Sequence, residues 1–176
     1  VIPIVTKLSV KFGKKNAFII ATLISIIGYV LKWWGFDPDN LWLMFMPIPF
    51  LSFGIGGLFT LMMSMTADVC DLDELNNGER REGMFGAVYW WMVKLGIAIA
   101  MLTSGIVLHV IGFDESVQQQ TAESLVNLRL ADIIIPIVAA FIAIFLVWKY
   151  DITETKALEI RQALIQRRGK VVHQGE

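Results

Sequence analysis

The sequence predicts an all-α membrane protein that crosses the bilayer four times. Its 176 residues are 56% hydrophobic and only 18% charged, a balance that soluble domains of this size rarely show. Four apolar runs, at about 16–34, 41–65, 84–111 and 128–148, are long enough to span a bilayer as helices, which takes about 20 residues. Helices are expected because the open edges of a sheet cannot be satisfied in lipid.

The segments outside these runs are short. Residues 1–15 are expected to form the end of a preceding membrane helix and a basic loop, and the start at Val1 without a signal-peptide pattern suggests a piece of a longer protein. Residues 150–176 form a tail with an expected amphipathic helix that lies on the membrane, packs under the bundle or is solvated. Three apolar tail residues can share one face of that helix: Ala157, Ile160 and Leu164.

Basic residues are concentrated on one side of the membrane. If each run crosses once, the loop before the first run, the link after the second and the tail share a side, and they carry most of the lysines and arginines. The links on the other side are acidic. Because basic residues favour the cytoplasmic side, the carboxyl terminus is expected in the cytoplasm.

Lys94 is the residue that most strongly indicates a function. It lies about ten residues into the third run, roughly 15 Å deep at the helical rise, which is near the membrane midplane. A charge there costs at least a few kcal/mol unless it is paired or hydrated. Since no acidic residue is expected deep in the four runs, its partner should be a carboxylate outside this chain, a substrate, or both. The alternative is a structural lysine bonded to backbone carbonyls.

Aromatic residues accompany Lys94 along the third run. Helical spacing places Trp90 and Trp91 on the same side as Lys94. Aromatic rings beside a buried polar group suit a sugar, whose apolar face stacks while its hydroxyls form hydrogen bonds. The alternative is that both tryptophans face lipid or pack against neighbouring helices.

Small residues recur every four positions in two of the runs, and such stripes predict close helix packing. The stripes are Ala17, Ala21 and Ser25 in the first run, and Gly96, Ala100 and Ser104 in the third. The second run contains Pro47, Pro49, Gly54, Gly56 and Gly57. These residues predict a locally weakened helix, either as a simple kink or as a bend with a gating role.

The link at 67–83 is expected to be a loop that contains a charged cluster. Its site candidates are Asp68, Asp71, Arg80, Arg81 and Glu82. The carboxylates lack the spacing of an EF-hand and have no nearby histidine, so a salt-bridge cluster is favoured over a metal site. The sequence contains no catalytic triad, phosphate loop or zinc motif. We therefore expect no enzyme activity, no cofactor, no metal and no nucleic-acid partner.

From this link onward the chain resembles the glycoside–pentoside–hexuronide:cation symporters of the major facilitator superfamily, which include melibiose permease. The motifs that carry the resemblance are Ala67-Asp68-Val69 with Asp71, Arg81-Glu82, Val93-Lys94 with Gly96, and Ile111-Gly112-Phe113. Residues 67–113 are the specific part. The resemblance extends over essentially the whole chain, as the last four of twelve helices and the tip of the eighth.

The resemblance implies a sugar or glycoside carried with Na⁺, H⁺ or Li⁺ by alternating access, in the cytoplasmic (inner) membrane of a bacterium. It implies that Val93 and Lys94 line the sugar and cation pocket. Phe59 takes the place of a pocket tryptophan, and Trp90 replaces a small hydroxyl residue. These two differences leave the sugar undetermined. In this family the cation-binding carboxylates lie in the amino-terminal half of the protein. The expected partners of this chain are therefore that half and membrane lipid.

Two hypotheses follow for the full protein. Lys94 pairs with a carboxylate of the amino-terminal half and links cation binding to substrate binding. The charged cluster around Asp68, Asp71 and Arg81 helps to hold a cytoplasmic gate shut. The alternatives are a transporter of the same fold for a hexuronide, an organic acid or a lysolipid, and a membrane subunit without transport activity.

Overall fold

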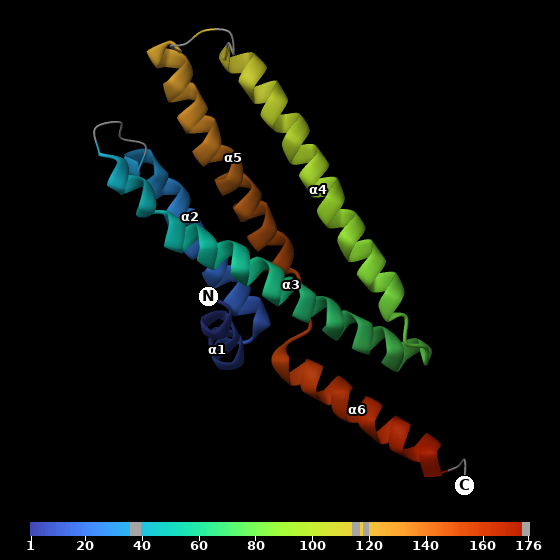
Figure 1. Ribbon diagram of the computed structural model, residues 1–176. Helices are drawn as coiled ribbons and strands as arrows, with labels where there is room; N and C mark the ends of the chain where they lie inside the picture. The colour runs from blue at the N-terminus through green and yellow to red at the C-terminus, as the bar shows by residue number, and fades with distance from the viewer. Residues whose placement is uncertain (36–39, 114–116, 118–119, 174–176) are drawn as a thin grey trace.

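The protein is built from helices (Figure 1), and its structure, a computed structural model, describes residues 1–35, 40–113, 117 and 120–173. The helices are α1 (Ile2–Phe12), α2 (Lys14–Gly35), a short 3₁₀ helix (Leu41–Phe45), α3 (Ile48–Asn77), α4 (Glu82–Ile111), α5 (Ala122–Trp148) and α6 (Glu154–His173). Four helical segments are long and apolar enough to cross a membrane: 14–35, 41–77, 82–111 and 122–148. The predicted all-α membrane fold is therefore confirmed.

The centre of the bundle is the contact between α2 and α3. Ala17, Ala21 and Ser25 are buried on α2. On α3, an added Cβ at Gly54 would lie 2.2 Å from Cβ of Ser25. Small residues on both helices thus let the two backbones approach closely. The predicted packing role of the first stripe is confirmed, and Gly54 serves packing.

The prolines of the second run lie at a helix start. Pro47 is the N-cap residue of α3 and Pro49 lies in its first turn, where a missing backbone N–H breaks no helical hydrogen bond. From Ile48 to Asn77 the chain is one continuous α-helix. The prolines therefore mark the start of α3, and the helix has no break at Gly54, Gly56 or Gly57, where the sequence predicts local weakening.

Two segments expected to be loops are helical. At the amino terminus only Gly13, with φ +79°, separates α1 from α2, because α1 is amphipathic and buries Val5 in the core. After the second span, α3 continues through the acidic residues to Asn77 and ends at Gly78, which adopts the left-handed conformation that glycine tolerates best. The charged residues at 68–77 therefore stand on a rigid helix.

α4 is the least covered of the long helices: none of its residues is buried. It meets α3 near the α3–α4 link and runs beside α5, away from α2 (Figure 1). A groove of about 540 Å³ separates α4 from α5, and Gly96, Ala100 and Ser104 line it. Within the described chain this second stripe makes no close contact at Gly96, where an added Cβ would meet nothing within 4 Å, so its packing role stays a prediction.

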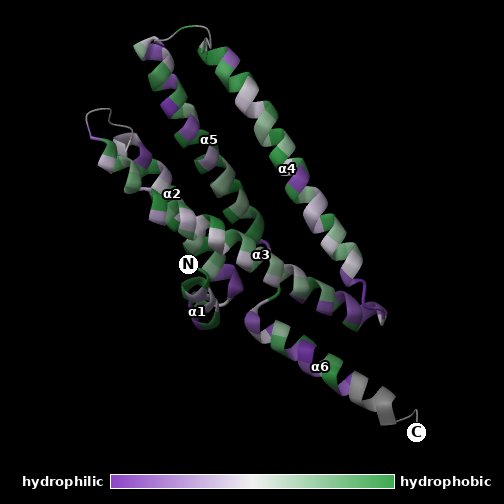
Figure 2. Ribbon diagram, viewed as in Figure 1, coloured by the Kyte–Doolittle hydropathy of each residue, from purple (hydrophilic) through white to green (hydrophobic). Residues whose placement is uncertain are grey.

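The tail helix α6 lies along the end of α3 (Figure 1). Ala157, Ile160 and Leu164 are all at most 5% exposed, so the predicted apolar face is buried. Hydrophilic residues gather on α6 and around the α3–α4 link, whereas α4 and α5 are largely hydrophobic (Figure 2). The molecule therefore has one strongly polar end.

Candidate functional site

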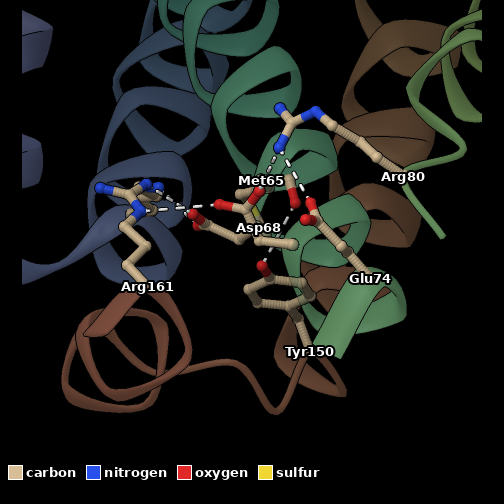
Figure 3. A network of polar contacts seen from close by, with 8 residues as sticks. Met65, Asp68, Glu74, Arg80, Tyr150 and Arg161 are labelled. Atoms are coloured by element: carbon tan, nitrogen blue, oxygen red, sulfur yellow. Dashed lines mark hydrogen bonds and ion pairs between the residues drawn. The ribbon is translucent and has the colours of Figure 1, made fainter. Parts of the chain in front are cut away.

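The polar end contains an ionic cluster, which we define as Lys14, Asp68, Asp71, Asp73, Glu74, Arg80, Arg81, Glu82 and Arg161. Asp68 is its most buried member, with a side chain that is 2% exposed. Its Oδ2 accepts a hydrogen bond from Lys14 Nζ, and its Oδ1 lies 2.9 Å from Nη2 of Arg161. Asp68 therefore joins the start of α2 to the tail helix across α3 (Figure 3).

The two arginines of the α3–α4 link bind the acidic end of α3. Arg80 Nη1 donates to Glu74 at 3.1 Å and to Asp71 at 3.4 Å, and its Nε donates to Glu82 at 2.9 Å. Arg81 donates two hydrogen bonds to Asp73, at 2.7 and 3.0 Å. Because Glu82 is the first residue of α4, these contacts fix the base of α4 to α3.

These carboxylates keep both arginines charged at every physiological pH. The hydrogen bonds that Arg80 donates to Glu82 and Glu74 raise its pKa, and those that Arg81 donates to Asp73 raise the pKa of Arg81. Burial, with Asp68 and Glu154 nearby, raises the pKa of Tyr150. Its phenol stays protonated and donates a hydrogen bond to the Met65 carbonyl at 3.4 Å.

The three basic segments meet at this end of the molecule. Lys15, next to Lys14, donates to the carbonyls of Trp148 and Tyr150 at 2.5 and 3.1 Å, and so caps the carboxyl end of α5. The start of α2, the α3–α4 link and the tail are therefore on one side, as the pattern of lysines and arginines indicates.

The candidate gate residues are thus brought together. Arg80 contacts both Asp71 and Glu82, whereas Arg81 pairs with Asp73. Two partners of Asp68 were not among the sequence candidates: Lys14 and Arg161. The sequence offered an indication for Arg161, because a residue beside the apolar face of Ile160 and Leu164 lies near whatever that face packs against.

The candidate pocket residues lie along the membrane-spanning parts of α3 and α4. Lys94 stands near the middle of α4 and is exposed, and within the described residues its Nζ makes no hydrogen bond or ion pair. Phe59, Trp90 and Trp91 are exposed, and Val93 is half-buried. Trp90 also lines a small cavity of about 130 Å³ between α3 and α4. The described chain therefore does not enclose a pocket around Lys94.

One acidic residue, Asp132, lies further along its helix than the expected run at 128–148 predicts. α5 begins at Ala122, before the expected start at Leu128, so Asp132 stands well inside the helix. Its Oδ2 lies 2.5 Å from Nζ of Lys32 on α2. This ion pair neutralises Asp132, and Lys94 is not its partner. The early start arises because Thr121 caps the helix, accepting a hydrogen bond from the Ser124 amide at 3.2 Å.

Comparison with known proteins decides the family. Residues 1–154 match the family model described as MFS/sugar transport protein. The chain belongs to this family. It is 29% identical over 158 residues to the glucuronide carrier protein homolog of Escherichia coli, covering 90% of this chain and 34% of that protein. An uncharacterised symporter of Synechocystis is 33% identical over 141 residues, covering 76% of this chain and 26% of that protein.

A third relative of the MFS/sugar transport family is the isoprimeverose transporter of Lactiplantibacillus pentosus. It is 27% identical over 150 residues, covering 84% of this chain and 31% of that protein. The chain spans about a third or less of the length of these curated relatives. The resemblance to the glycoside symporters is thereby confirmed, with the fold of an integral membrane sugar-transport family.

Proposed function

We propose that this chain is part of a secondary transporter that carries a sugar or glycoside together with a cation. The observation that carries the proposal is Lys94, an exposed charge near the middle of an apolar helix. A lysine held at that depth is expensive unless it meets a counter-charge or a substrate. The match to a sugar-transport family supports a substrate of that class.

The lack of buried residues on α4 supports a substrate site at its surface. Lys94, Trp90 and Phe59 are exposed on α4 and α3. Transporters of this type bind substrate near the midplane, between two halves of the molecule. We therefore place the site between this exposed surface and the rest of the full-length protein, with Na⁺, H⁺ or Li⁺ bound mainly by carboxylates there.

The ionic cluster is proposed as part of a gate on the cytoplasmic side of the inner membrane, where the tail also lies. It contains more carboxylates than basic residues, so it can accept further basic side chains from the rest of the protein. Its pairs fix the base of α4, the helix that carries Lys94. Opening the gate would then move Lys94 together with the cluster.

An uptake experiment tests the proposed transport. The full-length protein is reconstituted in liposomes and supplied with a radiolabelled methyl glucuronide or with isoprimeverose, under an inward gradient of Na⁺, Li⁺ or H⁺. We expect at least one glycoside to accumulate above equilibrium, and collapse of the gradient by an ionophore to abolish accumulation. Liposomes without protein are the control. Accumulation of an organic acid or a lysolipid, without any glycoside, would favour the alternative cargo.

Replacing Arg81 tests the gate. Arg81→Gln removes the two hydrogen bonds to Asp73 and should raise the rate of substrate exchange across the membrane, because the closed state is weakened. A solvent-exposed pair contributes only weakly, so an increase of a few-fold is expected. Asn76→Ala, an exposed position at the same end of α3, is the matched control. Unchanged exchange kinetics in Arg81→Gln would contradict the gating role.

A further inference from the structure

The tail helix places a cation against the acidic end of α3. Ala157, Ile160 and Leu164 bury the apolar face of α6, so packing fixes the position of the helix. Arg161 follows Ile160 directly and reaches across to α3 (Figure 3). The position of its guanidinium is therefore set by the docked helix as a whole.

Arg161 bridges two carboxylates of one helix turn. Its Nη2 lies 2.9 Å from Oδ1 of Asp68, and its Nε lies 3.8 Å from Oδ2 of Asp71. Residues three positions apart lie on the same face of a helix, where two negative charges repel each other. The planar guanidinium can meet both carboxylates at once, which a lysine ammonium does less well.

The same contacts continue to the base of α4. The second oxygen of Asp71 lies 3.4 Å from Nη1 of Arg80, whose Nε lies 2.9 Å from Glu82, the first residue of α4. Alternating charges thus run from the tail helix to the helix that carries Lys94. A change at the tail can reach α4 through adjacent ion pairs.

The two cations on Asp68 differ in exposure. The side chain of Lys14 is 11% exposed, whereas that of Arg161 is 46% exposed. Loss of Arg161 leaves Asp68 paired with Lys14, so the fold is kept. Loss of Arg161 also leaves Asp71 with Arg80 as its remaining partner in the ionic cluster. We expect Arg80 then to shift toward Asp71 and its contact with Glu82 to weaken.

We propose that Arg161 is a positioning residue of the gate: from the tail helix it holds Asp68 and Asp71 together and thereby fixes the base of α4. This rests on the proposed gating role of the ionic cluster. The docked tail helix then stabilises the position of the base of α4 through these ion pairs. Undocking the tail, or screening its contact with α3, frees the base of α4 to separate from α3.

Cys70 provides a test that needs no substrate. It is the single cysteine of this chain, is 2% exposed, and lines the small cavity between α3 and α4 together with Glu82. In the full-length protein in membranes, the rate at which N-ethylmaleimide modifies Cys70 is followed by mass spectrometry of its peptide. Arg161→Gln should raise this rate about fivefold, since a local opening controls access. Lys156→Gln, an exposed charge of the same helix, should leave it unchanged.

Ionic strength separates positioning from packing. In the wild type, high salt should raise the modification rate toward that of Arg161→Gln, because salt screens the exposed part of the contact. In Arg161→Gln, high salt should change the modification rate of Cys70 little. Arg161→Lys should give a modification rate of Cys70 between those of the wild type and Arg161→Gln. Equal rates in the wild type and Arg161→Gln, or equal salt responses, would overturn the proposal. The modification rates of Cys70 can change as expected while the wild type transports no glycoside. That outcome would support the positioning role of Arg161 and contradict the proposed transport function.

Discussion

Lys94→Ala should strongly reduce cation-coupled uptake while leaving the fold intact. A lost charge-assisted hydrogen bond is worth about 1.5–3 kcal/mol, so uptake should fall about ten- to a hundredfold. Stability should be unchanged, because Lys94 is exposed and makes no ion pair or hydrogen bond within the described chain. The two measurements are gradient-driven uptake in liposomes and the thermal unfolding midpoint in detergent.

The controls for Lys94 separate its charge from general effects of losing a lysine. Lys149→Ala removes an exposed lysine just after α5 and should retain uptake. Lys94→Arg keeps the charge but changes its geometry, so intermediate uptake is expected. Gradient-driven accumulation at the wild-type level in Lys94→Ala would sink the proposed role of this residue.

Asp68→Asn should cause the largest loss of stability in this chain. The Asp68 carboxylate is 2% exposed and accepts contacts from Lys14 and Arg161. Without it, the mostly buried ammonium of Lys14 has lost its counter-charge, a change that costs roughly 3–5 kcal/mol. The free energy of unfolding, measured in detergent, should fall by that amount, and α6 should dock less firmly.

Two variants make this prediction specific. Asp73→Asn removes a carboxylate whose partner, Arg81, is 39% exposed, and it should lower the stability much less than Asp68→Asn does. Adding Lys14→Gln to Asp68→Asn removes the uncompensated charge and should restore part of the loss, which a double-mutant cycle measures. A loss for Asp68→Asn no greater than that for Asp73→Asn would show that burial of this pair contributes little.

The membrane architecture was predictable because it depends on hydropathy and length. Four apolar runs became four spanning helices, and the stripe of Ala17, Ala21 and Ser25 became the central contact with α3. Helix ends were less predictable. Apolar runs predict the helices only up to their first charged residues, but α3 continues into acidic sequence where Lys14, Arg80 and Arg161 neutralise its charges.

The candidate site was predictable in residue types but not in partners. The cluster of Asp71, Arg80 and Glu82 is close in sequence, so its pairing follows from local spacing. Arg161 reaches Asp68 only because the tail folds back on α3, a contact between distant segments that no local pattern encodes. Lys32 and Asp132 also pair at long range. The pairing partner of Lys94 remains a prediction.

The bare surface of α4 has a consequence for how the protein is made. None of the residues of α4 is buried against the other helices of this chain. Packing against these helices therefore stabilises α4 little when it leaves the ribosome. Its entry into the bilayer must rest on its own apolar side chains, which have to outweigh the about 2.5–3.5 kcal/mol that a lysine costs at the centre of an inserting helix. Biosynthesis therefore limits how polar this helix can become, because further charged residues on α4 would prevent its insertion into the membrane.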